Sequence, residues 1–174
     1  MHLNLDLSGI NVKLNIFGYE KTNEENEYDL WCKTDFCFSS GEWLNYNIPN
    51  DEVFLCCEIE QLAEKLSMLL NDEINEVEKF ICMEPDFSFV LSPKKDLRKD
   101  PNFIYVQKGC EIVDIDLEWR ISFWHEGLTA NYLSVCLGRE NIEYLLCYFK
   151  LIIGKYDLNN NNIKSMIKKG ILTE

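Results

Sequence analysis

The segment from Val113 to Phe123 constrains the fold more than any other part of the sequence, because its apolar and polar side chains alternate without a break. The apolar positions are Val113, Ile115, Leu117, Trp119, Ile121 and Phe123. A period of two places such side chains on one face of a β-strand and leaves the other face to water. Parallel strands are usually covered on both faces and apolar throughout, so this segment predicts an antiparallel sheet.

Shorter stretches of the same alternation recur along the chain and are separated by turn-forming residues. They cover residues 3–7, 10–16, 28–38, 43–48, 78–91 and 130–137. We expect turns at Ser8-Gly9, at 39–42 and at Glu126-Gly127, because glycine and small polar residues favour tight turns. Proline donates no ladder hydrogen bond, so Pro49-Asn50-Asp51 is expected to end one strand and Glu84-Pro85 to interrupt another. The pattern predicts about seven or eight strands.

Two segments have the periodicity of a helix. Their apolar stripes are formed by Ile59, Leu62, Ala63, Leu66, Leu69 and Leu70, and by Ile142, Leu145, Leu146, Phe149, Ile152 and Ile153. This spacing predicts amphipathic helices over about 58–71 and 139–155, each with one face packed on the sheet. A short basic segment follows and stops at Gly170, a suitable helix C-cap. Since no linker or repeat divides the 174 residues, the sequence predicts a single α+β domain over 1–174.

The sequence contains neither a membrane span nor a secretory signal that we can identify. No stretch approaches the roughly 18–20 consecutive apolar residues of a transmembrane helix. The N-terminal segment alternates and carries Asp6, unlike the apolar run of a signal peptide. The eight cysteines lie mostly among apolar neighbours, as in Phe54-Leu55-Cys56-Cys57, where free thiols behave as small core residues. We expect a cytoplasmic protein that makes no membrane contact.

Catalytic machinery is not recognisable in the sequence. The chain has two histidines, His2 and His125, and no nucleophile elbow, phosphate-binding loop or dinucleotide fingerprint. The cysteine spacing matches no zinc motif. We therefore predict a protein that is not an enzyme, with no catalytic residue, no metal and no cofactor.

One row of carboxylates leaves a second interpretation open. Asp114, Asp116 and Glu118 share the polar face of the long alternating segment at two-residue intervals, so they could gather a hard cation such as Mg²⁺ or Ca²⁺. That reading implies a metal-assisted enzyme. The solvent face of an antiparallel sheet carries the same alternation without any such role, and it is the commoner origin of the pattern.

The charge of the chain indicates the kind of partner it can bind. The formal net charge is −13, which argues against a nucleic-acid partner because phosphate binding depends on clustered Lys and Arg. Between Asp51 and Asp86 there are eleven acidic residues and only two basic ones. Such a concentration favours a basic protein partner. The carboxylates that we predict to contact it are Glu73, Glu76, Glu78, Asp114, Asp116 and Glu118. A structural or assembly module with an exposed sheet edge is a further alternative, and the oligomeric state stays open.

Several short motifs occur in an order that resembles a known family. They are Gly18-Tyr19-Glu20, Tyr28-Asp29-Leu30-Trp31, a hairpin ending at Trp43, a helix after Cys57, and Glu84-Pro85-Asp86-Phe87-Ser88-Phe89. This order is similar to that of the WapI family of bacterial immunity proteins, over roughly residues 18–91 in motifs and elsewhere in layout. The resemblance implies a cytoplasmic protein that binds and neutralises a bacterial toxin domain, and it implies no catalytic residues.

Overall fold

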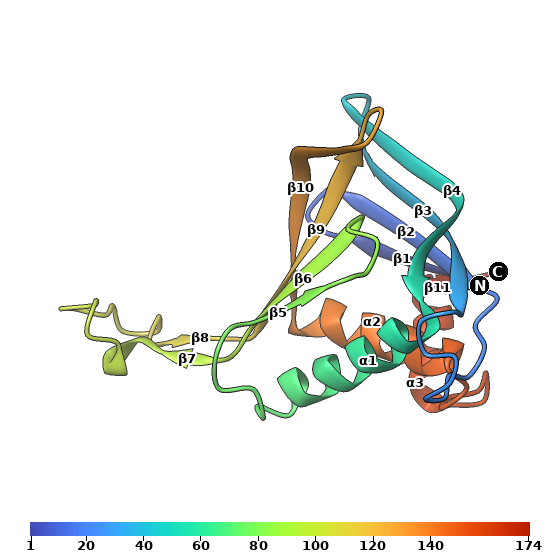
Figure 1. Cartoon of the computed structure of the whole chain (residues 1–174). Coiled ribbons are helices and arrows are strands. Elements are labelled where there is room, and N and C mark those ends of the chain that lie inside the picture. The colour runs from blue at the N-terminus through green and yellow to red at the C-terminus, as the bar shows by residue number, and fades with distance from the viewer.

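The computed structural model describes residues 1–174, which form two antiparallel sheets, three helices and a projecting hairpin (Figure 1). The first sheet has the order β11 (Leu172–Thr173), β1 (His2–Asp6), β2 (Asn11–Phe17), β3 (Trp31–Ser40) and β4 (Leu44–Leu55). The second has the order β10 (Leu128–Gly138), β9 (Asp116–Trp124), β6 (Phe87–Ser92) and β5 (Glu78–Ile81). The prediction of an α+β fold built mainly on antiparallel sheet is confirmed.

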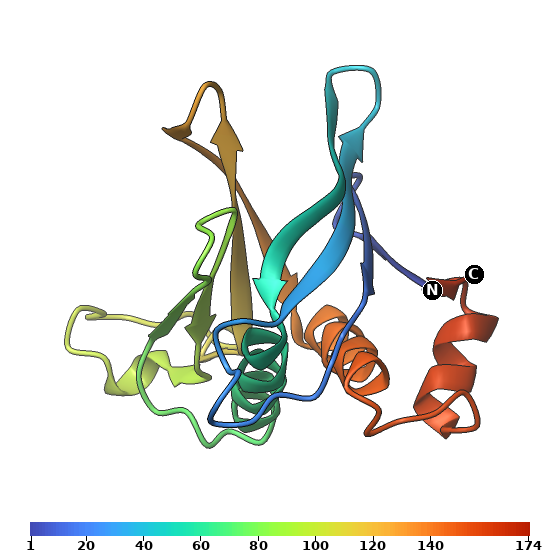
Figure 2. The same ribbon diagram turned by 45° about the vertical axis from the view of Figure 1, so that its right-hand side comes forward.

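The helices lie at one end of both sheets and join them. They are α1 (Cys56–Leu70), α2 (Arg139–Ile152) and α3 (Asn161–Lys168). α1 contacts β4 of the first sheet and β6 of the second, and α2 likewise contacts β1 and β9. Figure 2 shows the result: the sheets diverge from the helices, and the β3–β4 and β9–β10 hairpins stand as two separate prongs.

Aromatic side chains fill the space where the two sheets are closest. Phe36 of β3 lies against Phe87 of β6 and Trp119 of β9, with ring centroids 4.9 Å and 5.4 Å away. All three side chains are fully buried. They belong to one cluster of 37 buried residues that extends from Leu3 to Leu172 and includes the apolar faces of the helices. The aromatic contacts therefore fix the distance between the sheets below the prongs.

The predicted end of a strand at Pro49-Asn50-Asp51 is wrong. β4 continues to Leu55, and its register against β3 shifts on both sides of the Thr34–Asp51 pair. Asn50 takes a φ of +50°, and its N–H donates to Oδ1 of Asp35 at 2.9 Å. An irregular pairing absorbs the proline in this edge strand without ending it.

The long alternating segment is also divided in the structure. β9 begins at Asp116, whereas Val113 belongs to β8 (Ile112–Val113), which pairs with β7 (Lys95–Asp96). Asp114 lies in the break, and its carboxylate accepts two hydrogen bonds from the Arg139 guanidinium at 2.8 Å and 3.0 Å. Residues 94–113, which include the short 3₁₀ helix η1 (Leu97–Lys99), form a projecting arm.

The remaining elements agree closely with the sequence pattern. Three of the eleven strands, β7, β8 and β11, have two residues each, so the longer strands match the predicted seven or eight. The two long helices lie within two or three residues of their predicted limits. Gly170 follows α3 with a φ of +73°, the left-handed conformation that ends many helices.

Candidate functional site

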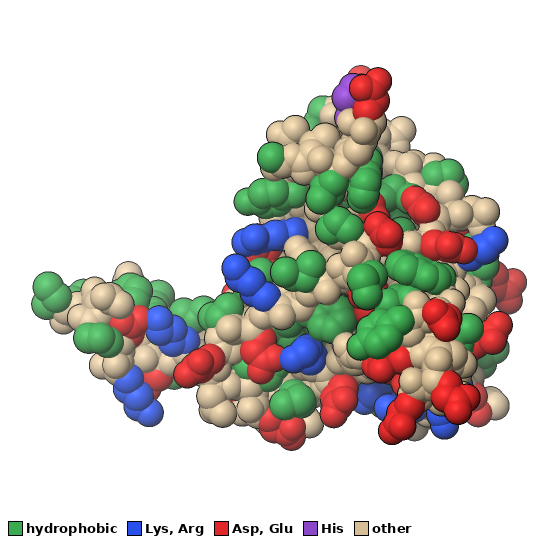
Figure 3. All heavy atoms as spheres, viewed as in Figure 1, with side chains coloured by type: hydrophobic (Ala, Val, Ile, Leu, Met, Phe, Trp, Pro, Cys, Tyr) green, Lys and Arg blue, Asp and Glu red, His purple; other side chains and the backbone are tan.

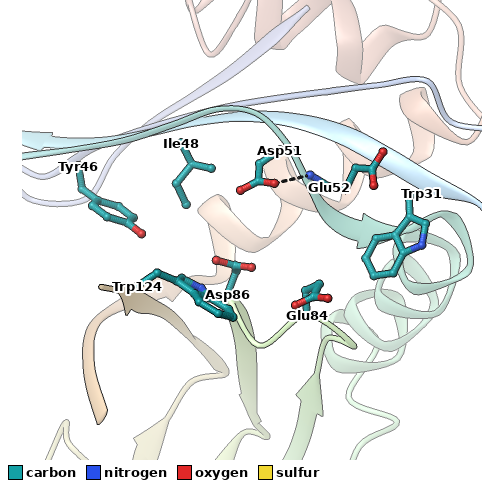
Figure 4. A pocket seen from close by; sticks show the side chains of 8 residues that line it. All are labelled: Trp31, Tyr46, Ile48, Asp51, Glu52, Glu84, Asp86 and Trp124. Atoms are coloured by element: carbon teal, nitrogen blue, oxygen red, sulfur yellow. Dashed lines mark hydrogen bonds between the residues drawn. The ribbon is translucent and has the colours of Figure 1, made fainter. Parts of the chain in front are cut away.

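A cleft of about 410 Å³ opens between the two sheets, beside the aromatic core. Eight residues line it: Trp31, Tyr46, Ile48, Asp51, Glu52, Glu84, Asp86 and Trp124. One wall is formed by β3 and β4, and the other by the β5–β6 loop and the end of β9 (Figure 4). On this face of the molecule apolar side chains run between the sheets with acidic side chains beside them (Figure 3). We call this site the acidic cleft.

Four residues with carboxylates line the acidic cleft from its two walls. Asp51 and Glu52 come from β4, and Glu84 and Asp86 come from the β5–β6 loop. None of the four takes part in any salt bridge of the chain. The cleft therefore concentrates negative charge that no side chain of this protein neutralises.

Asp86 is the most enclosed of the four carboxylates. The residue is only 7% exposed. Burial raises the pKa of its carboxyl, the nearby charges of Asp51 and Glu84 raise it further, and the Trp124 side chain opposes the rise. Loss of solvation and repulsion between like charges both disfavour the ionised form, so this carboxylate would gain from a cation.

Three aromatic rings complete the lining of the acidic cleft. Tyr46 of β4 packs edge-on against Phe123 of β9, with ring centroids 4.9 Å apart, so this contact joins the two walls. Trp124 faces Asp86, and Trp31 lies at the opposite end, beyond Glu84 (Figure 4). Trp124 is 43% exposed, an unusual degree for so large an apolar side chain. Carboxylates and exposed rings together can bind a cation by ion pairing and by cation–π contact.

Backbone hydrogen bonds hold the second wall in place. Glu58, a buried residue in the first turn of α1, accepts hydrogen bonds from the N–H groups of Leu55 at 2.9 Å and Met83 at 2.5 Å. It thus caps the helix and anchors the β5–β6 loop with the same carboxylate. Burial raises the pKa of Glu58, and these two backbone donors oppose the rise. The carbonyl of Asp86 accepts from Ser122 N–H at 2.8 Å, which joins the loop to β9.

The six carboxylates predicted to contact a partner lie elsewhere and are not gathered in one place. Glu73 and Glu76 are exposed between α1 and β5. Glu78 pairs with Lys65 at 2.6 Å. It lies opposite Leu91, whereas Glu118 lies opposite Val90, so the two project from different faces of the second sheet.

The row formed by Asp114, Asp116 and Glu118 is partly neutralised by basic residues of the chain. Asp114 forms the ion pair with Arg139 described above. Glu118 accepts hydrogen bonds from Arg120 at 2.8 Å and from Ser134 at 2.6 Å. Asp116 is half-buried, and burial raises its pKa. The division between β8 and β9 also removes Asp114 from the strand, and no group of three His, Cys, Asp or Glu side chains is placed to hold a metal ion.

None of the residues that line the acidic cleft is among the six carboxylates predicted to contact a partner. Asp51, Glu84 and Asp86 belong to the acid-rich segment, but charge alone does not distinguish them from its other carboxylates. One signal was available: Trp31, Glu84 and Asp86 lie in two of the motifs that carry the family resemblance. The structure brings these two motifs to the same cleft.

The comparisons with known proteins agree with this resemblance. No helix of the structure has both the length and the apolar character needed to cross a membrane. A search of curated proteins gives no match to the chain. The family model described as the immunity protein WapI-like family matches residues 3–157, which is most of the chain. The protein therefore belongs to the WapI-like family of immunity proteins.

Proposed function

We propose that this protein neutralises a bacterial toxin domain by direct contact, and that the acidic cleft is the surface that binds it. Membership of an immunity protein family supports the toxin-neutralising role. The observation that carries the choice of surface is the set of four carboxylates on facing walls, none of which has a basic partner in the chain. Acidic groups that lack internal partners are free to pair with a basic surface.

The net charge of −13 supports the same partner chemistry. A toxin that acts on nucleic acid presents Lys and Arg to phosphates, and an acidic protein can occupy that surface instead. Neutralisation by occupation requires no catalytic step from this chain. We place its action in the cytoplasm, where such a toxin meets its substrate.

Co-expression with the toxin domain encoded beside this gene tests the proposal. We expect the wild-type protein to restore growth and the double variant Asp51→Asn/Asp86→Asn to lose most of the protection. The matched control is Glu24→Gln/Glu25→Gln, which removes the same charge from an exposed loop away from the cleft. It should protect like the wild type.

A third variant tests whether the predicted contact residues Glu73 and Glu76, rather than the acidic cleft, bind the toxin domain. Charge reversal at the exposed residues Glu73 and Glu76 should leave protection unchanged if the cleft is the binding surface. Full protection by the cleft variant, together with lost protection on reversal at 73 and 76, would transfer the function to the α1–β5 segment.

A further inference from the structure

We propose that the acidic cleft receives one arginine side chain of the partner, whose guanidinium group pairs with Asp86 and Asp51 and lies against the Trp124 ring. This inference rests on the proposed function and states which group of the toxin the cleft recognises. It predicts a preference for arginine over lysine. The reasons are the enclosure of Asp86, the placement of carboxylates on both walls and the aromatic lining.

The enclosure of Asp86 means that its ionised form would be stabilised by a nearby cation. The residue is 93% buried, points into the cleft, and forms no salt bridge (Figure 4). The Trp124 side chain is a neutral neighbour and supplies no charge. Buried carboxylates are normally paired with a cation, and a cation from outside the chain can reach Asp86 through the cleft. The site therefore supplies the acidic half of an ion pair and lacks the basic half.

The placement of the carboxylates on two walls favours an extended organic cation over a bare metal ion. No three ligand-type side chains of the chain come close enough together to hold a metal. Carboxylates on two walls can still be reached by a planar group with several N–H donors. A guanidinium presents five donors in a fixed fork, and two parallel hydrogen bonds to one carboxylate leave donors for a second. An ammonium acts as a compact point charge and cannot span the walls in this way.

The aromatic lining adds a second preference for arginine. Guanidinium is delocalised, less strongly hydrated than ammonium, and stacks on aromatic faces. Trp124 and Trp31 lie at the two ends of the row formed by Asp86 and Glu84 (Figure 4). The volume of about 410 Å³ suits one long side chain rather than a whole secondary-structure element.

The outer face of the second sheet contains the same combination built from the chain's own residues. Arg120 donates to both carboxylate oxygens of Glu118 at 2.8 Å and 3.0 Å. Its guanidinium carbon lies 5.4 Å from the centre of the Tyr132 ring. At that site the chain itself provides the carboxylate, the aromatic ring and the guanidinium. The acidic cleft contains carboxylates and aromatic rings but no guanidinium.

Titration of the full-length protein with N-acetyl-arginine amide, followed by NMR of the four tryptophan indole N–H signals, tests this inference. We expect saturable shifts at Trp31 and Trp124 and none at Trp119 or the exposed Trp43. N-acetyl-lysine amide should bind several-fold more weakly. N-acetyl-citrulline amide, which has nearly the same shape as the arginine probe without its charge, should not bind. The Asp86→Asn variant should weaken arginine binding about tenfold.

A second test variant and a control variant accompany Asp86→Asn. Asp51→Asn alters an exposed carboxylate on the other wall, so it tests the site even if the change at Asp86 disturbs folding, and Glu25→Gln should have no effect. Equal binding of arginine and lysine, shifts at Trp43 as large as those at Trp124, or binding unchanged by both aspartate variants would overturn the inference. If the probe fails while cleft variants still abolish protection, the proposed function stands and the arginine preference is wrong.

Discussion

The ionised carboxylate of Asp86 has opposite effects on the proposed binding of a basic partner and on the folding stability of the free protein. Its carboxylate is enclosed and lies near Asp51 and Glu84, and burial with these like charges raises its pKa. A carboxyl with a raised pKa in the folded state contributes stability that is fully present below the unfolded pKa. That contribution is lost as the pH rises through the folded value. At neutral pH the ionised group therefore weakens the free protein.

Replacement of this carboxylate by its neutral isostere should therefore stabilise the free protein. We expect Asp86→Asn to raise the melting temperature at pH 7 by about 2–4 °C, which corresponds to roughly 1 kcal/mol for a chain of this length. The difference should shrink as the pH is lowered from 7 through the raised pKa of Asp86, because the wild-type group then takes up its proton. Thermal unfolding at pH 7 and at a series of lower pH values measures it. A lower melting temperature for the variant at pH 7 would show that the carboxylate supports the fold.

Glu58 connects two elements, because one buried carboxylate caps α1 and holds the β5–β6 loop. It does not line the acidic cleft. We expect Glu58→Ala to cost about 1–3 kcal/mol of unfolding free energy, since two backbone donors lose their acceptor. The Met83 amide should also exchange faster with solvent, and the cleft should bind its partner more weakly.

The control for this effect lies on the same helix. Glu64→Ala removes an exposed carboxylate of α1 and should change neither unfolding nor exchange. Glu58→Gln should recover part of the loss, because the amide oxygen can still accept one of the two hydrogen bonds. If Glu58→Ala leaves exchange at Met83 unchanged, the loop is held by other contacts.

The arm over residues 94–113 adds no apolar side chain to the core. None of its hydrophobic residues belongs to the buried cluster or packs against it, and Phe103, Ile104 and Tyr105 are exposed near its tip. Asp96 lies opposite Ile112, so an Asn-Gly pair can replace residues 97–111 as a two-residue hairpin turn. We expect the shortened protein to melt within about 2 °C of the wild type, as measured by circular dichroism. A large loss would mean that the arm stabilises the sheets.

The extent of successful prediction differs between elements for physical reasons. Periodicity identified α1, α2 and most of β9, because one buried face imposes its period on the sequence. It missed the break before Asp116, because the alternation continues through Asp114 although that residue pairs with Arg139, far along the chain, and not with a neighbouring strand. It also missed the continuation of β4 past Pro49, because an irregular pairing on an edge strand accepts proline.

The acidic cleft was beyond prediction for a related reason. Trp31, Asp86 and Trp124 come from three separate regions of the sequence, and only the packing of one sheet on the other brings them together. The charge count identified the acid-rich segment between Asp51 and Asp86, but it could not show which of its carboxylates lie together in the folded chain. The predicted contact role of Glu73, Glu76, Glu78, Asp114, Asp116 and Glu118 stays a prediction, although three of them have basic partners within the chain.

At the scale of the whole molecule, the fold sets two sheets apart above a shared base of helices and leaves negative charge between them (Figure 2). The net charge of −13 can attract a basic partner from a distance, but that attraction is screened by salt. Once a partner covers the acidic cleft, the contacts inside it are shielded from solvent and should determine how slowly the partner leaves.

The central claim, that the acidic cleft is the toxin-binding surface, is tested most directly by calorimetric titration with the toxin domain encoded beside this gene. We predict that Asp51→Asn/Asp86→Asn raises the dissociation constant by about 100-fold, because basic groups of the partner lose buried acceptors. Glu24→Gln/Glu25→Gln should stay within about twofold of the wild type, as expected for exposed charges. Wild-type affinity in the cleft variant would contradict the claim.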